Sequence, residues 1–281
     1  MSYPDHRGGG EVDLVEQLDV RLLRVGALSI GREWTHADLR APHWRLYLNK
    51  QDGARIWPAG GGVLPLQERR RYLVPAWVAF ATAARDRVEH IFCHLDLPAL
   101  PAAVVRECFP RPLALTRDPA QESALIRLGD AVAAGEPPGA AAVCGFKAAA
   151  YAAFSEALTG LPAPARERVL RCVRRDLPIR AALECINERP AGDCSNASLA
   201  RLCGCTSDHL IRLFRRHLGR TPVQVVQERR LAVAAQALAY TDDPIEAIAE
   251  RCGFANRFYF TRVFARAMGA PPAAYRRRQR A

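Results

Sequence analysis

The stretch LARLCGCTSDHLIRLFRRHLGRTP at residues 199–222 decides the fold of the last third of this 281-residue chain, because it returns in altered form. The second version, IAERCGFANRFYFTRVFARAMGAPP, occupies residues 248–272, so matching positions lie 49 to 50 residues apart. Neither copy is long enough to bury a core by itself, and such a repeat predicts two similar helical units packed into one domain. Each copy has the layout of a helix-turn-helix, with a short helix, a glycine turn and a longer amphipathic helix.

Basic residues are concentrated in the part of the chain that holds the repeat. The whole chain has a formal charge of +11, and residues 180–281 contribute most of it, with 17 Arg, no Lys and 9 acidic residues. A basic domain beside a nearly neutral one is typical of a protein that binds a polyanion through one domain only. Two helix-turn-helix units in a basic domain therefore point to DNA.

Two other kinds of sequence precede the repeat. Residues 18–118 contain short apolar runs between Gly- and Pro-rich turns, which predict a small β-barrel or sandwich. Residues 119–177 are Ala-rich with helical periodicity and predict helices at 120–134, 142–158 and 163–176. The expected fold class is α+β: a flexible N-terminus at 1–17, a barrel, a helical linker or dimerisation segment, and an all-α domain at 178–281.

Capping signals divide the last domain into seven helices. Thr221-Pro222-x-Gln224 supplies a capping hydroxyl, a proline in the first turn and a glutamine at the third position. We expect Asn196, Thr206 and Asp243 to cap other helices. The expected helices are 178–188, 197–203, 206–218, 222–240, 244–252, 256–267 and 271–278.

The helix expected at 222–240 connects the two units. At about 1.5 Å per residue it spans roughly 28 Å. A rigid rod of that length can hold two recognition helices about one DNA turn (~34 Å) apart, in successive major grooves. One chain would then read two segments of the same duplex.

These motifs resemble the DNA-binding domain of AraC/XylS-type transcription regulators, with order and spacing intact. The resemblance implies seven helices, two helix-turn-helix units and a central connecting helix. It is carried by Leu199-Ala200, Gly204, Phe214-Arg-Arg, Gly219-x-x-Pro222, Arg230-Leu231-x-x-Ala234, Ile248-Ala249, Cys252-Gly253-Phe254, Tyr259-Phe260-Thr-Arg262-x-Phe264 and Pro271-x-x-x-Tyr275-Arg276.

Helical periodicity separates the side chains that face the core from those that face DNA. Leu210, Leu213 and Phe214 form the inward stripe of the first recognition helix. Phe254, Phe260, Val263 and Phe264 do so in the second unit. The predicted DNA-binding residues are Ser207, Asp208, Ile211, Arg212 and Arg215 in the first unit, and Asn256, Arg257, Phe258, Thr261 and Arg262 in the second.

Roles within this set follow from side-chain chemistry. Arg212, Arg257 and Arg262 are candidates for bidentate contact with guanine, and Phe258 for contact with thymine methyl groups. Phe258 could instead belong to the core, and we expect Tyr259 mainly to pack. Phosphate contacts are expected from Arg215, Arg216 and the arginines of residues 276–280, although a terminal Arg run can also be simply solvated.

A further resemblance reaches into residues 20–100, which look like the cupin-type sensor barrel of arabinose- and other sugar-responsive members of that family. The matching features are Arg45-Leu-Tyr-Leu, Gly53, Leu64-Pro65, Tyr72-Leu-Val-Pro75, Phe80 and His90-x-x-x-His94. A pocket with aromatic walls and a few directed polar groups suits a small polar ring compound. The predicted ligand-binding residues are Trp34, His36, Arg45, Tyr47, Trp57, His90 and His94, although several tryptophans could be barrel core.

Metal and catalytic signals are weak. The His-x-His with a downstream Glu that many cupins use is absent, and Cys203-Gly-Cys205 has no matching Cys or His pair at a zinc spacing. No spacing of nucleophile and base suggests catalysis. We expect no catalytic residue, no metal and no cofactor.

The sequence thus predicts a cytoplasmic, ligand-responsive transcription regulator. We expect double-stranded DNA, a small polar effector such as a sugar, a second copy of the chain and, for an activator, RNA polymerase as partners. No secretory signal or membrane-spanning stretch is expected. Two alternatives stay open: a cupin metalloenzyme fused to a DNA-binding module, and a DNA binder that needs no ligand.

Overall fold

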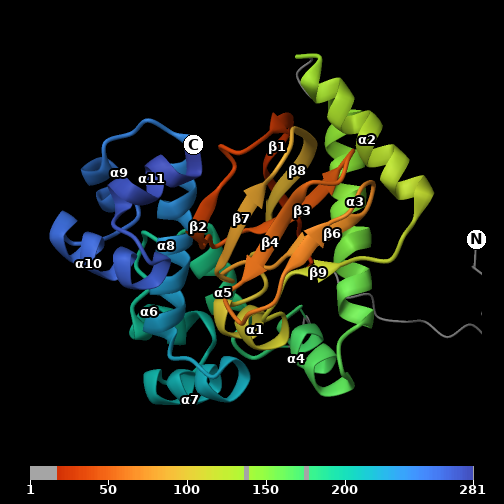
Figure 1. The fold of residues 1–281 in the computed structure, drawn as a ribbon. Helices are drawn as coiled ribbons and strands as arrows, with labels where there is room; N and C mark the ends of the chain where they lie inside the picture. Colours follow the sequence, from red (N-terminus) through yellow and green to blue (C-terminus); the bar gives the residue numbers. More distant parts are fainter. Residues whose placement is uncertain (1–17, 136–138, 174–176, 281) are drawn as a thin grey trace, which may run out of the picture.

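The computed structural model describes residues 18–135, 139–173 and 177–280 (Figure 1). The flexible N-terminus expected at residues 1–17 lies outside the described residues. The described chain has the expected α+β fold, with antiparallel sheets in its N-terminal part and helices in its C-terminal part.

Two antiparallel sheets form the N-terminal part. One has the strand order β1-β8-β3-β6-β9 and the other the order β2-β7-β4-β5. The strands are β1 (Arg21–Ile30), β2 (His36–Leu39), β3 (Trp44–Asn49), β4 (Ala54–Pro58), β5 (Leu64–Leu66), β6 (Arg71–Val74), β7 (Phe80–Ala84), β8 (Val88–Asp96) and β9 (Leu113–Ala114).

Alternation along the strands gives the larger sheet two different faces. On β8, Ile91, Cys93 and Leu95 belong to a core shared with helices, whereas Val88 and Phe92 belong to the cluster between the two sheets. The register pairs Arg45 with His94 and Tyr47 with Phe92, so these side chains share the inner face. The inner face therefore collects the polar and aromatic residues predicted to bind a ligand.

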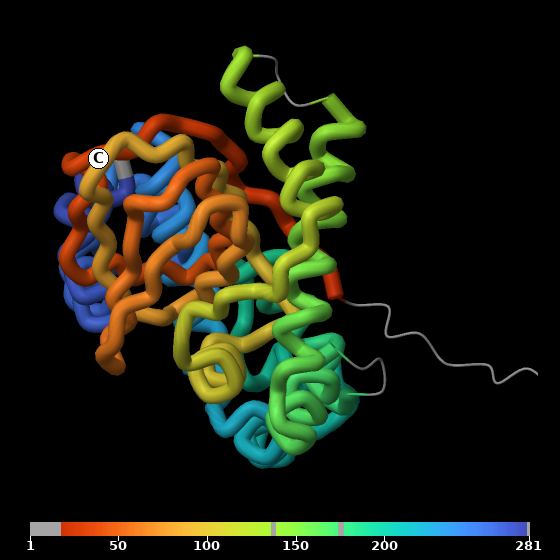
Figure 2. Tube along the Cα trace, turned by 45° about the vertical axis from the view of Figure 1, so that its right-hand side comes forward, coloured from red at the N-terminus to blue at the C-terminus, as the bar shows by residue number. Residues whose placement is uncertain are grey.

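Four helices cover the outer face and lower end of the sheets: α1 (Ala102–Cys108), α2 (Pro119–Ala133), α3 (Ala140–Thr159) and α4 (Ala163–Val173). Asp118 caps α2 by accepting hydrogen bonds from the backbone of Ala120 and Gln121. Where α2 crosses the sheet, Gly129 lies so close to Ile91 that a Cβ would meet it at 2.7 Å. Figure 2 shows α2 and α3 as a paired layer beside the strands.

Seven helices follow, as the repeat predicted: α5 (Arg180–Glu188), α6 (Asn196–Leu202), α7 (Ser207–Leu218), α8 (Pro222–Tyr240), α9 (Ile245–Arg251), α10 (Arg257–Met268) and α11 (Pro272–Arg280). Thr221 and Gln224 form the expected capping box of α8. Two expected caps are wrong: Ser195 caps α6 instead of Asn196, and α9 begins after Pro244 with no side-chain cap. Asp243 instead pairs with Arg251 at 2.6 Å.

The two helix-turn-helix units belong to different cores. Leu199, Leu210 and Phe214 of the first unit are part of one cluster that extends through α4 and α3 to the large sheet. Phe260 and Phe264 of the second unit form a separate cluster with the second half of α8. The first unit is therefore continuous with the N-terminal part, and the second is a satellite carried by α8.

Candidate functional site

The first recognition helix, α7, is built to present one basic face. Thr206 caps it, and Leu210, Phe214 and Leu218 are buried on its inner side. The predicted contacts Asp208, Arg212 and Arg215 are exposed, while Ser207 and Ile211 are half-buried. Arg216 is exposed as well.

The second recognition helix, α10, repeats this design with different side chains. Phe260, Phe264 and Met268 are buried. Arg257 and Arg262 are exposed, and Thr261 is half-buried. Asn256 is also exposed, but its side chain caps the helix by accepting a hydrogen bond from the Tyr259 backbone at 2.8 Å. Because one lone pair of its oxygen is engaged in the cap, the amide nitrogen of Asn256 is the group left without a partner in this contact.

Two aromatic residues mark the N-terminal end of α10. Phe258 is 86% exposed and Tyr259 41% exposed, so Phe258 lies outside the core. Tyr259 is partly packed, because its hydroxyl accepts a hydrogen bond from the Gln227 amide at 3.2 Å and the Arg262 guanidinium lies 5.7 Å from its ring centroid. The helix thus presents an apolar tip beside cationic groups, which suits the methyl and phosphate surface of a major groove.

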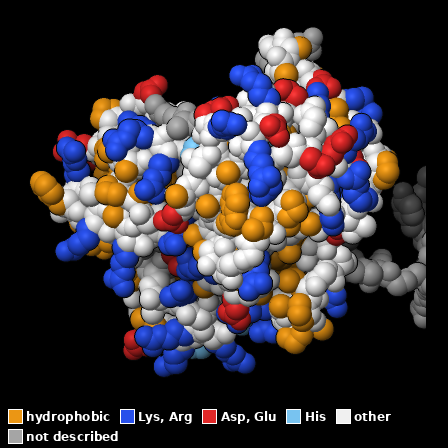
Figure 3. Space-filling model, in the orientation of Figure 1, with side chains coloured by type: hydrophobic (Ala, Val, Ile, Leu, Met, Phe, Trp, Pro, Cys, Tyr) orange, Lys and Arg blue, Asp and Glu red, His pale blue; other side chains and the backbone are white. Residues whose placement is uncertain are grey.

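Aligning α7 and α10 on their N-cap residues, Thr206 and Asn256, shows which positions of the two helices are equivalent. With this register Ser207 corresponds to Arg257, Asp208 to Phe258 and Arg212 to Arg262. Only the last of these pairs has the same residue type in both helices. Figure 3 shows blue side chains over the part of the surface that Figure 1 assigns to α6–α11, and these are arginines because residues 180–281 contain no Lys.

The turn of each unit requires the glycine that the repeat conserves between its copies. Gly204 and Gly253 have φ of +62° and +79°, a region that L side chains rarely adopt. In the second unit Arg230 of α8 holds this turn, since its Nε and Nη1 donate to the carbonyls of Pro190 and Gly253, each at 2.7 Å. Arg230 therefore joins the second unit to the loop before the first, a role that sequence reasoning missed.

Five of the predicted ligand-binding residues meet between the sheets. The Tyr47 ring lies 4.7 Å from that of His90 and 6.4 Å from that of His94. The Trp34 ring lies 5.3 Å from His90. Arg45 is buried, with its guanidinium 5.1 Å from the Phe80 ring centroid.

The other two predicted ligand residues are placed differently. Trp57 is on the face of β4 opposite to the inward-pointing Ala54 and Ile56, so grouping it with the others was wrong. The expectation failed because a short strand does not reveal from its sequence which face is inward. His36 is half-buried on the edge strand β2, where it pairs with Thr82.

The histidines at this end of the barrel are held neutral. Burial lowers the pKa of His90 to about 3, and its Nδ1 lies 2.7 Å from the Asn49 amide oxygen. Burial, reinforced by the nearby Arg45 charge, holds the pKa values of His43 and His94 well below 6.5. Among the described residues Arg45 has no ion-pair partner and its Nη1 no hydrogen bond.

The barrel touches the second half of α8 and the second unit directly. His94 Nδ1 and the Tyr240 hydroxyl are 3.0 Å apart, and burial raises the pKa of Tyr240 to about 12. The Arg40 guanidinium donates to the Ala267 carbonyl of α10 at 3.3 Å. Closer to the first unit, Asp96 accepts a 2.7 Å bond from Arg229. No sequence motif predicted these contacts between the barrel and the C-terminal helices.

Across residues 18–135, 139–173 and 177–280, no group of three or more His, Cys, Asp or Glu side chains is placed to hold a metal ion. Cys203 and Cys205 are both free thiols. In the same ranges, no helix is long and apolar enough to cross a membrane.

Comparison with known proteins supports the assignment of the C-terminal helices to a helix-turn-helix domain. Residues 199–278 match a family described as a helix-turn-helix domain. Over 100 residues the chain is 33% identical to the RCS-specific HTH-type transcriptional activator RclR of Escherichia coli, and over 82 residues 32% identical to the MmsAB operon regulatory protein of Pseudomonas aeruginosa. These stretches cover 36% and 29% of this chain but only 35% and 27% of those two proteins.

The fold of the whole chain has a solved counterpart. ToxT of Vibrio cholerae O395 has a TM-score of 0.57 and 11% identity, over 91% of this chain and 97% of that one. At this identity the likeness concerns the fold. Together with the seven-helix geometry, the sequence matches place residues 199–278 in the AraC/XylS class of DNA-binding domains.

Proposed function

We propose that this protein is a ligand-responsive transcription regulator that binds operator DNA through α7 and α10. The observation that carries the proposal is the pair of capped recognition helices, each with exposed arginines near its N-terminal half, joined by the rigid α8. The relatives that match the domain are transcription regulators, which supports the same reading. We further propose that the protein acts without catalysis and in the cytoplasm.

The test of DNA binding uses the equivalent arginines of the two units. An operator is first selected from random duplexes with the full-length protein. Arg212→Ala and Arg262→Ala should each cost about 1–3 kcal/mol of binding free energy and relax the preference at one position of one half-site. Arg127→Ala, an exposed arginine on α2, is the matched control.

Uniform weakening on every sequence would reassign an arginine to phosphate contact. If neither arginine variant differs from the Arg127→Ala control, the proposed DNA-reading faces are wrong.

For the effector, we propose that it binds between the sheets, against Trp34, Arg45, Tyr47, His90 and His94. The buried Arg45 guanidinium has donor capacity left for an oxygen-rich molecule, and a sugar or related polar metabolite fits that chemistry. A ToxT structure described as bound to an unsaturated fatty acid supports ligand binding within this fold. Carboxylate oxygens would satisfy the same donor.

A thermal-shift screen of the full-length protein separates these classes. Sugars should raise the melting temperature, and Arg45→Met should remove the rise. If carboxylates shift the protein and sugars do not, the carbohydrate proposal is wrong. A response that Arg45→Met leaves intact would move the effector to another part of the molecule.

We also propose that the protein works as a dimer and as an activator that contacts RNA polymerase. Val143 of α3 and Leu170 of α4 are large exposed apolar residues, which supports the helical layer as the self-association surface. Light scattering of the wild-type protein and of Val143→Glu tests the dimer. Transcription in vitro with and without effector tests activation.

A further inference from the structure

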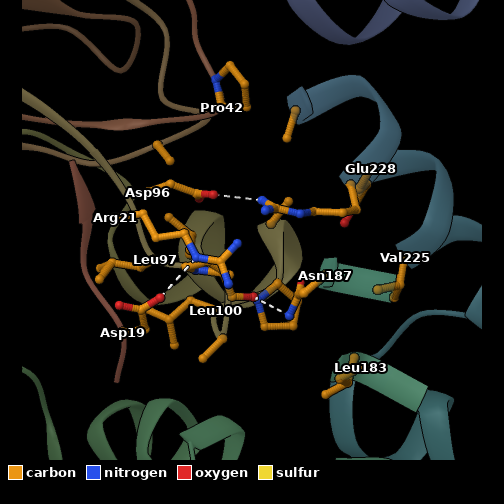
Figure 4. A pocket seen from close by; sticks show the side chains of 18 of the residues that line it. Asp19, Arg21, Pro42, Asp96, Leu97, Leu100, Leu183, Asn187, Val225 and Glu228 are labelled. Carbon is orange, nitrogen blue, oxygen red and sulfur yellow. Dashed lines mark hydrogen bonds and ion pairs between the residues drawn. The ribbon is translucent and has the colours of Figure 1, made fainter. Parts of the chain in front are cut away.

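A cavity of about 310 Å³ lies outside the barrel, where the end of β8 and the start of α1 meet α5 and α8. None of the seven predicted ligand residues lines it. Figure 4 shows Arg21, Asp96 and Leu97 approaching from the β-sheet side and Asn187 and Glu228 from the helical side. A pocket of this size between two domains is a common location for small-molecule binding.

The lining combines an apolar body with a surplus of acid. Trp44, Trp77, Leu100, Leu183 and Val225 supply aromatic and aliphatic surface. Three arginines line the cavity, against five carboxylic acids: Asp19, Asp96, Glu184, Glu188 and Glu228. This acidic excess stands in a chain whose formal charge is +11. Two arginines outside the lining, Arg106 and Arg220, pair with Glu228, so the excess belongs to the lining itself and is balanced when both partners are counted.

Three carboxylates of the wall interact with arginines that line the cavity, one of them being Glu184 with Arg180. Asp19 pairs with Arg21 at 2.9 Å, and Asp96 with Arg229 at 2.7 Å. Glu228 differs, because only one of its oxygens is used. Its Oε1 accepts from Arg106 at 2.9 Å, whereas Oε2 is buried without a hydrogen-bond partner among the described residues. A buried carboxylate oxygen left this way is costly unless a donor fills the space beside it.

The aromatic wall carries a strained residue. Trp77 has φ of +67°, a conformation that is an outlier for a bulky side chain. A hydrogen bond from its backbone nitrogen to the Ala41 carbonyl, at 2.7 Å, holds it there. Backbone strain of this kind concentrates at ligand-binding sites. The ring face also attracts cations, since the Arg106 guanidinium lies 5.6 Å from its centroid.

We propose that this junction cavity is a second ligand site, separate from the barrel, that takes a lipophilic organic cation: an apolar body with one amino group. The body packs against Trp77, Leu100 and Leu183. The amino group donates to Glu228 Oε2 and gains from the other carboxylates that line the wall. Burial of the body supplies most of the affinity, and the charge supplies the selectivity.

Such a ligand would bridge two parts of the chain. Leu100 and Trp77 belong to the N-terminal part, whereas Leu183 belongs to α5 and Glu228 to α8. A ligand that contacts both sides favours the docked arrangement by its differential affinity for that state. The inference concerns binding alone and does not require the proposed DNA function.

The test uses three probes on one body with the full-length protein: 2-phenylethylamine, 2-phenylethanol and 3-phenylpropanoate. Calorimetry should give about tenfold tighter binding of the amine than of the alcohol, and weaker binding still of the carboxylate. Glu228→Gln keeps the side-chain shape and should bring the amine to the level of the alcohol. Glu246→Gln, an exposed acid on α9, is the matched control that removes the same charge elsewhere.

A second variant tests whether the probes bind in the cavity, so that the proposal does not depend on Glu228→Gln alone. Ala232→Leu fills part of the cavity from α8 and should weaken amine and alcohol equally, while circular dichroism confirms the fold. Equal binding of amine and alcohol, an amine affinity that Glu228→Gln leaves unchanged, or no amine binding to the folded wild-type protein would each overturn the proposal. Operator binding, measured separately without probe, reports on the proposed DNA function.

Discussion

The two helix-turn-helix units share one design but differ in what they pack against. Leu210 and Phe214 of the first unit join a core that continues into the sheet-covering helices, whereas Phe260 and Phe264 of the second form a cluster of their own with α8. The difference indicates that the first unit shares its core with the N-terminal part. The second unit meets that part through separate contacts, such as the hydrogen bond from Arg40 to the Ala267 carbonyl.

The largest expected effect on stability comes from removing the equivalent buried rings of the two units. Phe214→Ala and Phe264→Ala each delete a fully buried ring and should cost about 3–5 kcal/mol of unfolding free energy. All four tryptophans lie in the N-terminal part, so their fluorescence reports mainly on that part, and Trp77 also packs against the cluster of the second unit. In urea, Phe214→Ala should shift fluorescence and circular dichroism together, and Phe264→Ala should shift the helical signal first. Coincident curves for both variants would mean that the units share one core.

The two ends of α8 should also differ in how firmly they are tied to the barrel. Arg229→Met leaves the Asp96 carboxylate buried without its partner and should cost about 3 kcal/mol of unfolding free energy. Tyr240→Phe at the other end removes one hydrogen bond to His94 and should cost about 1 kcal/mol. Urea denaturation measures both. Asp96→Leu combined with Arg229→Met should recover most of the loss, and equal costs for the two single variants would contradict the comparison.

Acid should loosen the contact beside the second unit. The folded pKa of His94 lies well below 6.5, so the unfolded chain binds a proton that the folded chain does not. This histidine's contribution to stability is therefore full above about pH 6.5 and falls by about 1.4 kcal/mol for each pH unit below it. Groups facing it are Arg24, Arg45, His43, His90 and Tyr240, and the two arginines and His90 oppose its protonation.

The measurement is the slope of unfolding free energy against pH between 6.5 and 5. His94→Gln should lower that slope by about the amount that one histidine contributes. His209→Gln, on the exposed face of α7, is the control and should leave the slope unchanged. A slope that is the same in His94→Gln as in the wild type would show that His94 does not drive the acid response.

Alanine substitution of the equivalent residues that differ most between the two units should give the smallest change in stability. Asp208→Ala and Phe258→Ala alter exposed tips, so each should change the unfolding free energy by less than about 0.5 kcal/mol. Their effects on operator affinity should have opposite signs. Loss of Phe258 removes apolar contact, whereas loss of Asp208 removes a negative charge near phosphate. Fluorescence anisotropy measures the affinity of each variant for the selected operator. Changes of the same sign would mean that Asp208 and Phe258 contribute to operator binding in the same way.

Much of the fold follows from local signals. Helix caps and glycine turns act within a few residues, and the seven C-terminal helices were therefore predictable to within a few positions. The short strands β2, β4, β5 and β9 and the helix α1 were missed, because two to seven residues carry too little periodicity. The face of Trp57 was misassigned for the same reason. Phe258 was assigned correctly to the exposed face, because helical spacing places a residue two positions before a buried ring on another side.

By itself, the sequence determined the class of the C-terminal domain, the exposed faces of α7 and α10 and the connecting helix, because each depends on residues close together in the chain. The tertiary structure alone decided which side chains of the barrel meet and which unit shares a core with it. It also created the junction cavity, in which Trp77 and Glu228 face a common space although 151 positions separate them. Contacts over such distances depend on how whole layers pack, and a pattern read along the chain does not contain that information.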